Sequence, residues 1–168
     1  METMSKQKVI QILQRKNISL FDINDAQKIF PFQNKNSLYK LLQRLEKADI
    51  LKRVANGKYM ISFKEVNDFE LANFLINTSY ISLESALSFY GILSQFPYTI
   101  TSITIQKTKK IICNKKEFEF THLRKEYFLG FIKKDNFLIA LPEKALLDEF
   151  YFISKGLRNL SLEELNLS

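Results

Sequence analysis

The sequence predicts an α+β protein in two parts. Residues 1–64 are expected to form a winged helix-turn-helix, and residues 65–168 a mixed α/β domain with a small, mostly antiparallel sheet. Positive charge is concentrated in the first part, which has 13 Lys and Arg against 5 Asp and Glu, whereas the second part has 12 against 13. The basic part also contains three helical segments followed by a hairpin, which is the element order of a winged helix.

The first two helices are indicated by their caps. Ser5 is placed to cap a helix whose apolar residues recur at helical spacing over positions 9–13. Asp22 and Asp25 have the spacing of an N-cap and an acidic residue at the third helical position, which predicts a second helix. We expect Pro31 to end that helix, because proline cannot donate the next backbone hydrogen bond.

The third helix has the clearest period, and its two faces differ in character. Apolar residues recur at i, i+3, i+4, i+7 and i+10, namely Leu38, Leu41, Leu42, Leu45 and Ala48. An α-helix fits the major groove of DNA, where Asn and Gln can pair with adenine and Lys and Arg with guanine. We therefore expect DNA contacts from the polar face and the N-terminal end, with Arg44 on phosphate; the other candidates are Asn34, Lys35, Asn36, Ser37, Tyr39 and Lys40. Taken alone, such a face is more often simply solvated.

A hairpin follows the third helix. Asn56 and Gly57 form the dipeptide suited to a type I′ turn, and apolar residues lie on both sides of it. Lys52, Arg53 and Lys58 would then line the hairpin and bind backbone phosphate or the minor groove. Winged helices also bind proteins, so the fold alone does not decide between these partners. The excess of positive charge favours DNA.

The second part alternates helices and strands. A helix is expected over residues 68–76, and a second one is capped by Ser82 and ended by Gly91. A third begins at Pro142, since proline is well tolerated at a first helical position. Strands are expected near residues 98–105, 117–120, 127–132 and 137–141. The strand around Thr101 is either buried on both faces or bulged. Lys144 can pair with Asp148 at i+4.

Three segments of the chain resemble the AbiEi-type antitoxins of type IV toxin-antitoxin, or abortive-infection, systems. They are YISLESALSFYG from Tyr80, TSIT from Thr101 followed by Lys107–Lys110, and PEKALLD from Pro142. The resemblance implies that the N-terminal domain represses its own operon at inverted repeats in the promoter. It also implies that the C-terminal domain antagonises a partner nucleotidyltransferase toxin, with or without a stable complex.

The same residues do not suggest catalysis. His122 and Asp148 lack the spacing of a hydrolase triad, and the four glycines form no phosphate-binding loop. For these reasons we expect no enzyme activity and no cofactor. One cysteine and one histidine cannot make a zinc finger, so we expect no metal either. A run of five lysines follows in the second part and allows two interpretations. It is either a solvated hairpin tip or a second basic surface that binds nucleic acid or the toxin; the residues are Lys107, Lys109, Lys110, Lys115 and Lys116.

The composition predicts a cytoplasmic protein without a membrane span, since no apolar run approaches about 20 residues and the first eight residues lack a signal-peptide core. Two other functions remain open at this point. The chain could be a protein-interaction module without an operator, or a transcriptional regulator whose second domain binds a small molecule.

Overall fold

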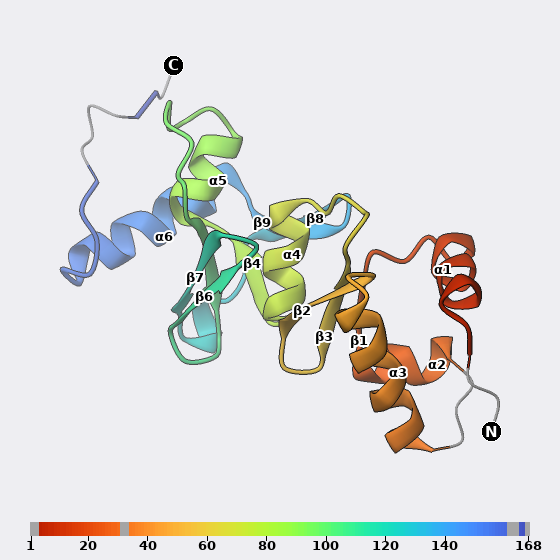
Figure 1. Cartoon of the computed structure of the whole chain (residues 1–168). Coiled ribbons are helices and arrows are strands. Elements are labelled where there is room, and N and C mark those ends of the chain that lie inside the picture. The colour runs from red at the N-terminus through yellow and green to blue at the C-terminus, as the bar shows by residue number, and fades with distance from the viewer. Residues whose placement is uncertain (1–3, 31–33, 161–164, 167–168) are drawn as a thin grey trace. The chain divides into compact units, whose positions relative to one another are not determined.

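The structure is a computed structural model that describes residues 4–30, 34–160 and 165–166. The chain divides into two units, Met1–Val66 and Asn67–Ser168, and the described part is α+β with six α-helices and two sheets (Figure 1). None of these helices combines the length and apolar character needed to cross a bilayer.

The first unit contains three helices and a three-stranded antiparallel sheet in the order β1-β3-β2. Its elements in chain order are α1 (Lys6–Arg15), β1 (Leu20–Asp22), α2 (Ile23–Ile29), α3 (Lys35–Lys47), β2 (Leu51–Ala55) and β3 (Lys58–Ile61).

Both predicted caps of this unit are confirmed. The Ser5 hydroxyl accepts a hydrogen bond from the backbone N–H of Lys8 at 3.3 Å. Asp22 and Asp25 form a reciprocal capping box at the start of α2, which satisfies backbone donors that the first turn leaves open. Helix α2 ends at Ile29, and Pro31, its predicted stop, lies outside the described residues.

Helix α3 buries the face that its period predicts. Leu38, Leu41, Leu42 and Leu45 are buried, whereas Ala48 is the C-cap and only half-buried. They share one core with Phe21 and Phe30 and with residues of α1 and the sheet. The core therefore fixes which face of α3 is left to solvent.

The hairpin between β2 and β3 is present, but a type I′ turn is not. That turn needs positive φ at both central residues, whereas here Gly57 has φ +67° and Asn56 lies outside the positive region. The register between the strands also shifts between Arg53 and Ala55. With this bulge, only one residue of the turn, Gly57, needs a positive φ, which glycine adopts without strain.

The second unit contains a six-stranded mixed sheet in the order β6-β7-β5-β4-β9-β8. Three of its five pairings are antiparallel, while β5 with β7 and β4 with β9 are parallel. The sheet is therefore larger and more mixed than expected. Its strands are β4 (Ser79–Ile81), β5 (Ile100–Thr104), β6 (Lys109–Cys113), β7 (Lys116–His122), β8 (Phe131–Lys134) and β9 (Phe137–Ala140).

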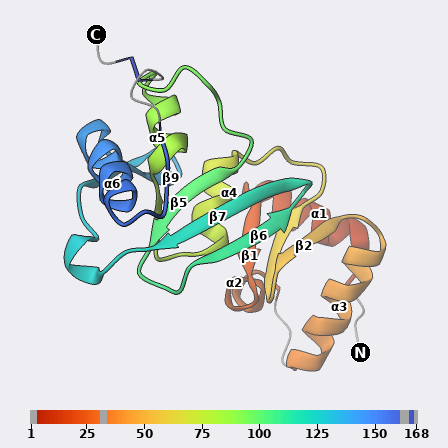
Figure 2. The same cartoon turned by 90° about the vertical axis from the view of Figure 1, so that its left-hand side faces the viewer.

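Three α-helices complete this unit, namely α4 (Asp68–Leu75), α5 (Leu83–Phe89) and α6 (Pro142–Ser154). Helices α5 and α6 lie side by side (Figure 2), and Pro142 opens α6 as predicted. All five residues of β5 are buried, so the first of the two alternatives for the strand around Thr101 is the one observed.

The strand predicted over residues 127–132 is wrong in its first half. Residues Lys125–Tyr127 form a 3₁₀ turn, and β8 begins only at Phe131, after Gly130 at φ +78°. A β-carbon on Gly130 would lie 3.0 Å from the side chain of Lys144, so a larger residue would displace Lys144 slightly and would be strained at this positive φ.

Candidate nucleic-acid interface

The N-terminal half of α3 is an exposed polar part of the first unit. Asn34 is the N-cap, and its side-chain oxygen accepts a hydrogen bond from the N–H of Asn36 at 2.8 Å. This bond gives Asn34 a structural role beside any contact with DNA. The next turn is exposed except for the half-buried Ser37; the exposed predicted residues are Lys35, Asn36, Tyr39 and Lys40.

Tyr39 and Arg53 come from different elements and line one pocket of about 320 Å³ between α3 and the hairpin. Tyr39 is 46% exposed and lies one helical turn before Gln43, which lines the same pocket. Gln43 belongs to the predicted polar face, and the i+4 spacing from Tyr39 is the signal that selects it. Glu46 also lines the pocket, so its lining is not uniformly basic.

The wall on the hairpin side is held by side-chain hydrogen bonds. The Arg53 guanidinium donates to the side-chain oxygen of Asn56 at 2.7 Å, which holds it over the turn. Tyr59 lies beside it, and burial raises the pKa of its hydroxyl, so that the hydroxyl remains a donor at neutral pH. The Tyr59 ring stacks on Phe21 with centroids 5.7 Å apart.

Lys52 and Lys58 do not line this pocket. Lys52 is exposed and adjacent to Arg53, and consecutive strand residues point to opposite faces. Lys58 is half-buried at the start of β3. Of the three predicted cations of the hairpin, only Arg53 lines the pocket beside α3.

The cations of α3 and β2 differ in their partners. Lys35, Lys40, Lys47 and Lys52 have no ion-pair partner among the described residues, and their charge is open to solvent. Arg44 is half-buried, and its guanidinium donates to the backbone carbonyl of Met4. That contact ties α3 to the segment before α1 and reduces the freedom of Arg44 to bind phosphate.

The lysine run of the second unit follows the β6–β7 hairpin, and part of its charge is neutralised. Lys110 pairs with Glu117 and Glu119, and Lys116 pairs with Asp68. Lys107, Lys109 and Lys115 are exposed and have no such partner in the described part of the chain. The surface is therefore less basic than the sequence run suggests.

The three segments that carry the family resemblance meet in one buried network. Asp148 is 2% exposed and accepts hydrogen bonds from the Tyr80 hydroxyl at 2.9 Å and the Ser82 hydroxyl at 2.8 Å. Its other oxygen pairs with Lys144, whose side chain is only 13% exposed, as the i+4 spacing predicts. Burial raises the pKa of Asp148 while Lys144 and the two hydroxyls oppose that rise.

The middle segment contributes Thr101. Ser82 occupies the N-cap position of α5 as predicted, but its side chain does not make the cap hydrogen bond, since its hydroxyl donates to Asp148. The hydroxyl of Thr101 instead accepts from the N–H of Ser85 at 3.0 Å and donates to the Ser82 carbonyl at 2.8 Å. A neighbouring strand therefore supplies the cap. Leu83, the first residue of α5, has a positive φ of +57°, which is strained for a leucine.

Beside Asp148 lies a carboxyl group without a partner. Glu149 is 0% exposed, and neither of its side-chain oxygens has a hydrogen-bond partner. Burial, followed by the nearby charge of Glu84, raises its pKa to about 7, while Arg158 opposes the rise. Arg158 itself bridges Glu84 and Glu119. Within the described residues, no three His, Cys, Asp or Glu side chains are grouped so as to hold a metal ion.

Comparison with known proteins assigns no family to the chain. Neither a scan of protein-family models nor a search of curated proteins gives a match to the chain.

Proposed function

We propose that the first unit is a winged helix-turn-helix that binds duplex promoter DNA, and that the whole chain is an antitoxin and autorepressor similar to the AbiEi type. The observation that supports DNA binding best is the shared pocket of Tyr39 and Arg53. It joins the exposed face of α3 to the hairpin, so that a helix in the major groove and a hairpin on the backbone would contact adjacent parts of one duplex.

The unpaired charge of this unit supports the same proposal. Lysines without an ion-pair partner release counterions from DNA without first giving up a contact in the protein. Lys35, Lys40 and Lys52 meet this condition among the described residues. If about six cations neutralise phosphates, log K should fall against log salt with a slope of roughly −5.

The antitoxin half of the proposal rests on the resemblance and on the convergence of its three segments. Tyr80, Ser82, Thr101, Lys144 and Asp148 form one hydrogen-bonded group. Such a group stabilises the arrangement of α5, α6 and the sheet. We therefore assign the resembling residues to the integrity of the antitoxic domain, and leave contact with the toxin to other, exposed residues.

Fluorescence anisotropy tests DNA binding. The full chain is titrated with its own upstream duplex and with a shuffled duplex across a salt series. We expect a preference of about 10³ or more for the native sequence and the slope given above. Equal weak binding to both duplexes, or a slope near zero, would contradict the proposal.

Four variants divide helix contacts from hairpin contacts. Asn36→Ala and Tyr39→Ala should relax sequence preference by about 1–3 kcal/mol. Lys52→Ala and Arg53→Ala should weaken binding to every duplex and reduce the salt slope by about 1 each. Lys133→Ala, at an exposed lysine of β8, is the matched control and should change neither. Equal losses on all sequences from all four variants would remove the assignment of base contacts to α3.

Antitoxicity is tested by co-expression with a nucleotidyltransferase toxin encoded beside the chain. We expect growth to be restored by the full chain and also by the doubly substituted Asn36→Ala, Tyr39→Ala chain, because the antagonism is assigned to the second unit. Absence of rescue by the full chain, with DNA binding intact, would leave the repressor and remove the antitoxin.

A further inference from the structure

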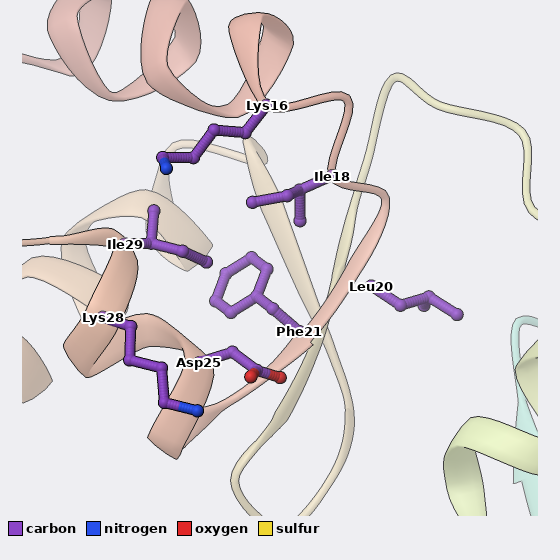
Figure 3. A pocket seen from close by; sticks show the side chains of 7 residues that line it. All are labelled: Lys16, Ile18, Leu20, Phe21, Asp25, Lys28 and Ile29. Carbon is purple, nitrogen blue, oxygen red and sulfur yellow. The ribbon is translucent and has the colours of Figure 1, made fainter.

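A second recess lies in the first unit, away from the pocket of Tyr39 and Arg53. It has a volume of about 290 Å³ and is lined by the end of α1, by β1 and by α2. Figure 3 shows the side chains of Ile18, Phe21 and Ile29 directed toward one another, whereas Leu20 points away. The recess therefore has an apolar interior close to the lower limit of size for small-molecule sites.

Charged groups flank this apolar interior. Lys16 follows α1 and Lys28 lies on α2, and neither has an ion-pair partner among the described residues. Asp25 is the third charged residue of the lining, and its carboxylate accepts from the N–H of Asp22 at 3.2 Å, which engages it in the cap of α2. The recess is thus flanked by two ammonium groups, Lys16 on one side and Lys28 on the other (Figure 3), and by one carboxylate that already has a backbone partner.

From this arrangement we infer that the recess binds a small carboxylate with an apolar body, held by Lys16 and Lys28 and seated against Ile18, Phe21 and Ile29. An apolar body fills the interior, where displacement of water is favourable. The two lysine side chains, which are long and flexible, then turn toward the carboxylate from the two sides of the recess. A neutral ligand would lose the second contribution, and a purely inorganic anion would lose the first.

One side chain of the recess also reaches the face assigned to DNA. Phe21 is 1% exposed and stacks on Tyr59 at an interplanar angle of 22°, and Tyr59 lines the pocket of Tyr39 and Arg53. A ligand that shifts Phe21 alters the packing of the ring that stacks on it, because buried side chains are closely packed and transmit strain. The site is therefore coupled to the α3 and hairpin face, and the effect of this coupling on DNA affinity rests on the proposed function.

The test uses 3-phenylpropionate, its neutral amide and inorganic phosphate as probes of the full chain, followed by backbone amide chemical shifts in NMR spectra. We expect 3-phenylpropionate to bind with a Kd of about 1 mM, as suits a ligand of its size. Shifts should appear at residues 16–30 and, through the ring stack, at Tyr59 and Arg53. The amide and phosphate should each bind at least about fivefold more weakly.

Substitution at the rim supplies the second arm. Lys16→Gln combined with Lys28→Gln should weaken 3-phenylpropionate at least about fivefold. The control, Lys6→Gln with Lys47→Gln, removes the same charge from lysines that do not line the recess. If the amide binds as tightly as 3-phenylpropionate, the site is only an apolar patch. If phosphate binds as tightly as 3-phenylpropionate, it is only an anion site. Either result overturns the inference, as does no binding of 3-phenylpropionate at 20 mM.

The DNA arm separates this inference from the proposed function. In the absence of ligand, the variant with Lys16→Gln and Lys28→Gln should bind DNA within about twofold of the natural chain, because these lysines are assigned to the ligand. A large loss of DNA affinity would assign them to DNA phosphate and overturn the inference. If the chain binds no DNA at all, the shifts at Tyr59 and Arg53 still report the ligand and its coupling.

Discussion

The two units differ in what their charged side chains contact. In the second unit Lys110, Lys116, Lys144 and Arg158 are all paired with carboxylates, and Asp148 and Glu149 are buried. In the first unit several lysines, Lys40 and Lys52 among them, are exposed without an ion-pair partner in the described residues. The six ion pairs of Lys110, Lys116, Lys144 and Arg158 all lie in the second unit, which also has exposed lysines in its β6–β7 hairpin, whereas Lys40 and Lys52 of the first unit form none with the residues that the structure describes.

The largest effect expected from this difference concerns Asp148. Asp148→Ala removes the acceptor of Tyr80 and Ser82 and leaves Lys144, which is 13% exposed, without its partner. Loss of one member of a buried ion pair costs about 3–5 kcal/mol. We expect that loss in the free energy of unfolding of the second unit, measured by hydrogen exchange at amides of β5.

The matched substitution is Lys40→Ala in the first unit, at an exposed cation of α3. It should change the free energy of unfolding by less than about 0.5 kcal/mol. Comparable losses from the two variants would break the distinction between structural and accessible charge.

A smaller effect is expected from the titration of Glu149. Its pKa is about 7 in the folded chain and 4.5 for an ordinary glutamate, so the folded state binds the extra proton between these values. The free energy of unfolding should therefore fall as pH rises from about 4.5 to 7, by up to about 3 kcal/mol, and this contribution should be constant above pH 7. Urea unfolding at pH 5 and pH 8 measures the change.

Glu149→Gln keeps the shape of the side chain and removes its titration. Its advantage over the natural chain should grow by about 2–3 kcal/mol from pH 5 to pH 8. Glu143→Gln, at an exposed acid in the first turn of the same helix, is the control. Parallel pH profiles for the natural chain and Glu149→Gln would show that Glu149 does not titrate in this range.

The smallest effects compare two serines that precede helices, one in each unit. Ser82→Ala deletes a hydrogen bond to a buried carboxylate, which is worth about 1.5–3 kcal/mol. Ser5→Ala deletes an exposed cap bond of 3.3 Å and should cost about 0.5–1 kcal/mol. Thermal unfolding of both variants tests the order. A larger loss for Ser5→Ala would mean that the Ser82 bond adds little to stability.

The sequence predicted those features whose cause is local. The capping box of Asp22 and Asp25, the buried face of α3, the opening of α6 at Pro142 and the pairing of Lys144 with Asp148 all depend on residues within a few positions of each other. Helical periodicity and capping are properties of such short windows.

The features that sequence reasoning missed depend on distant partners. Ser82 has the sequence of an N-cap, but its hydroxyl donates to Asp148, 66 positions away, and Thr101 supplies the cap from another strand. The burial of Glu149 follows from packing between elements, and a glutamate is otherwise one of the least buried residues.

For the candidate DNA face, the polar side of α3 was predictable from its period. The shared pocket of Tyr39 and Arg53 was not, because it depends on how the β2–β3 hairpin packs beside α3, which no short stretch of sequence specifies. A period identifies which residues of a helix face solvent, whereas the packing of separate elements decides which of them become neighbours.

The parallel pairing of β4 with β9 has a consequence for synthesis on the ribosome. Ile81 pairs with Ile139, so the sheet of the second unit cannot close until more than 50 further residues have emerged. The first unit, by contrast, ends at Val66 and makes its sheet within one short stretch of chain. Because nearby contacts form before distant ones, we expect the basic unit to fold while the rest of the chain is still being translated.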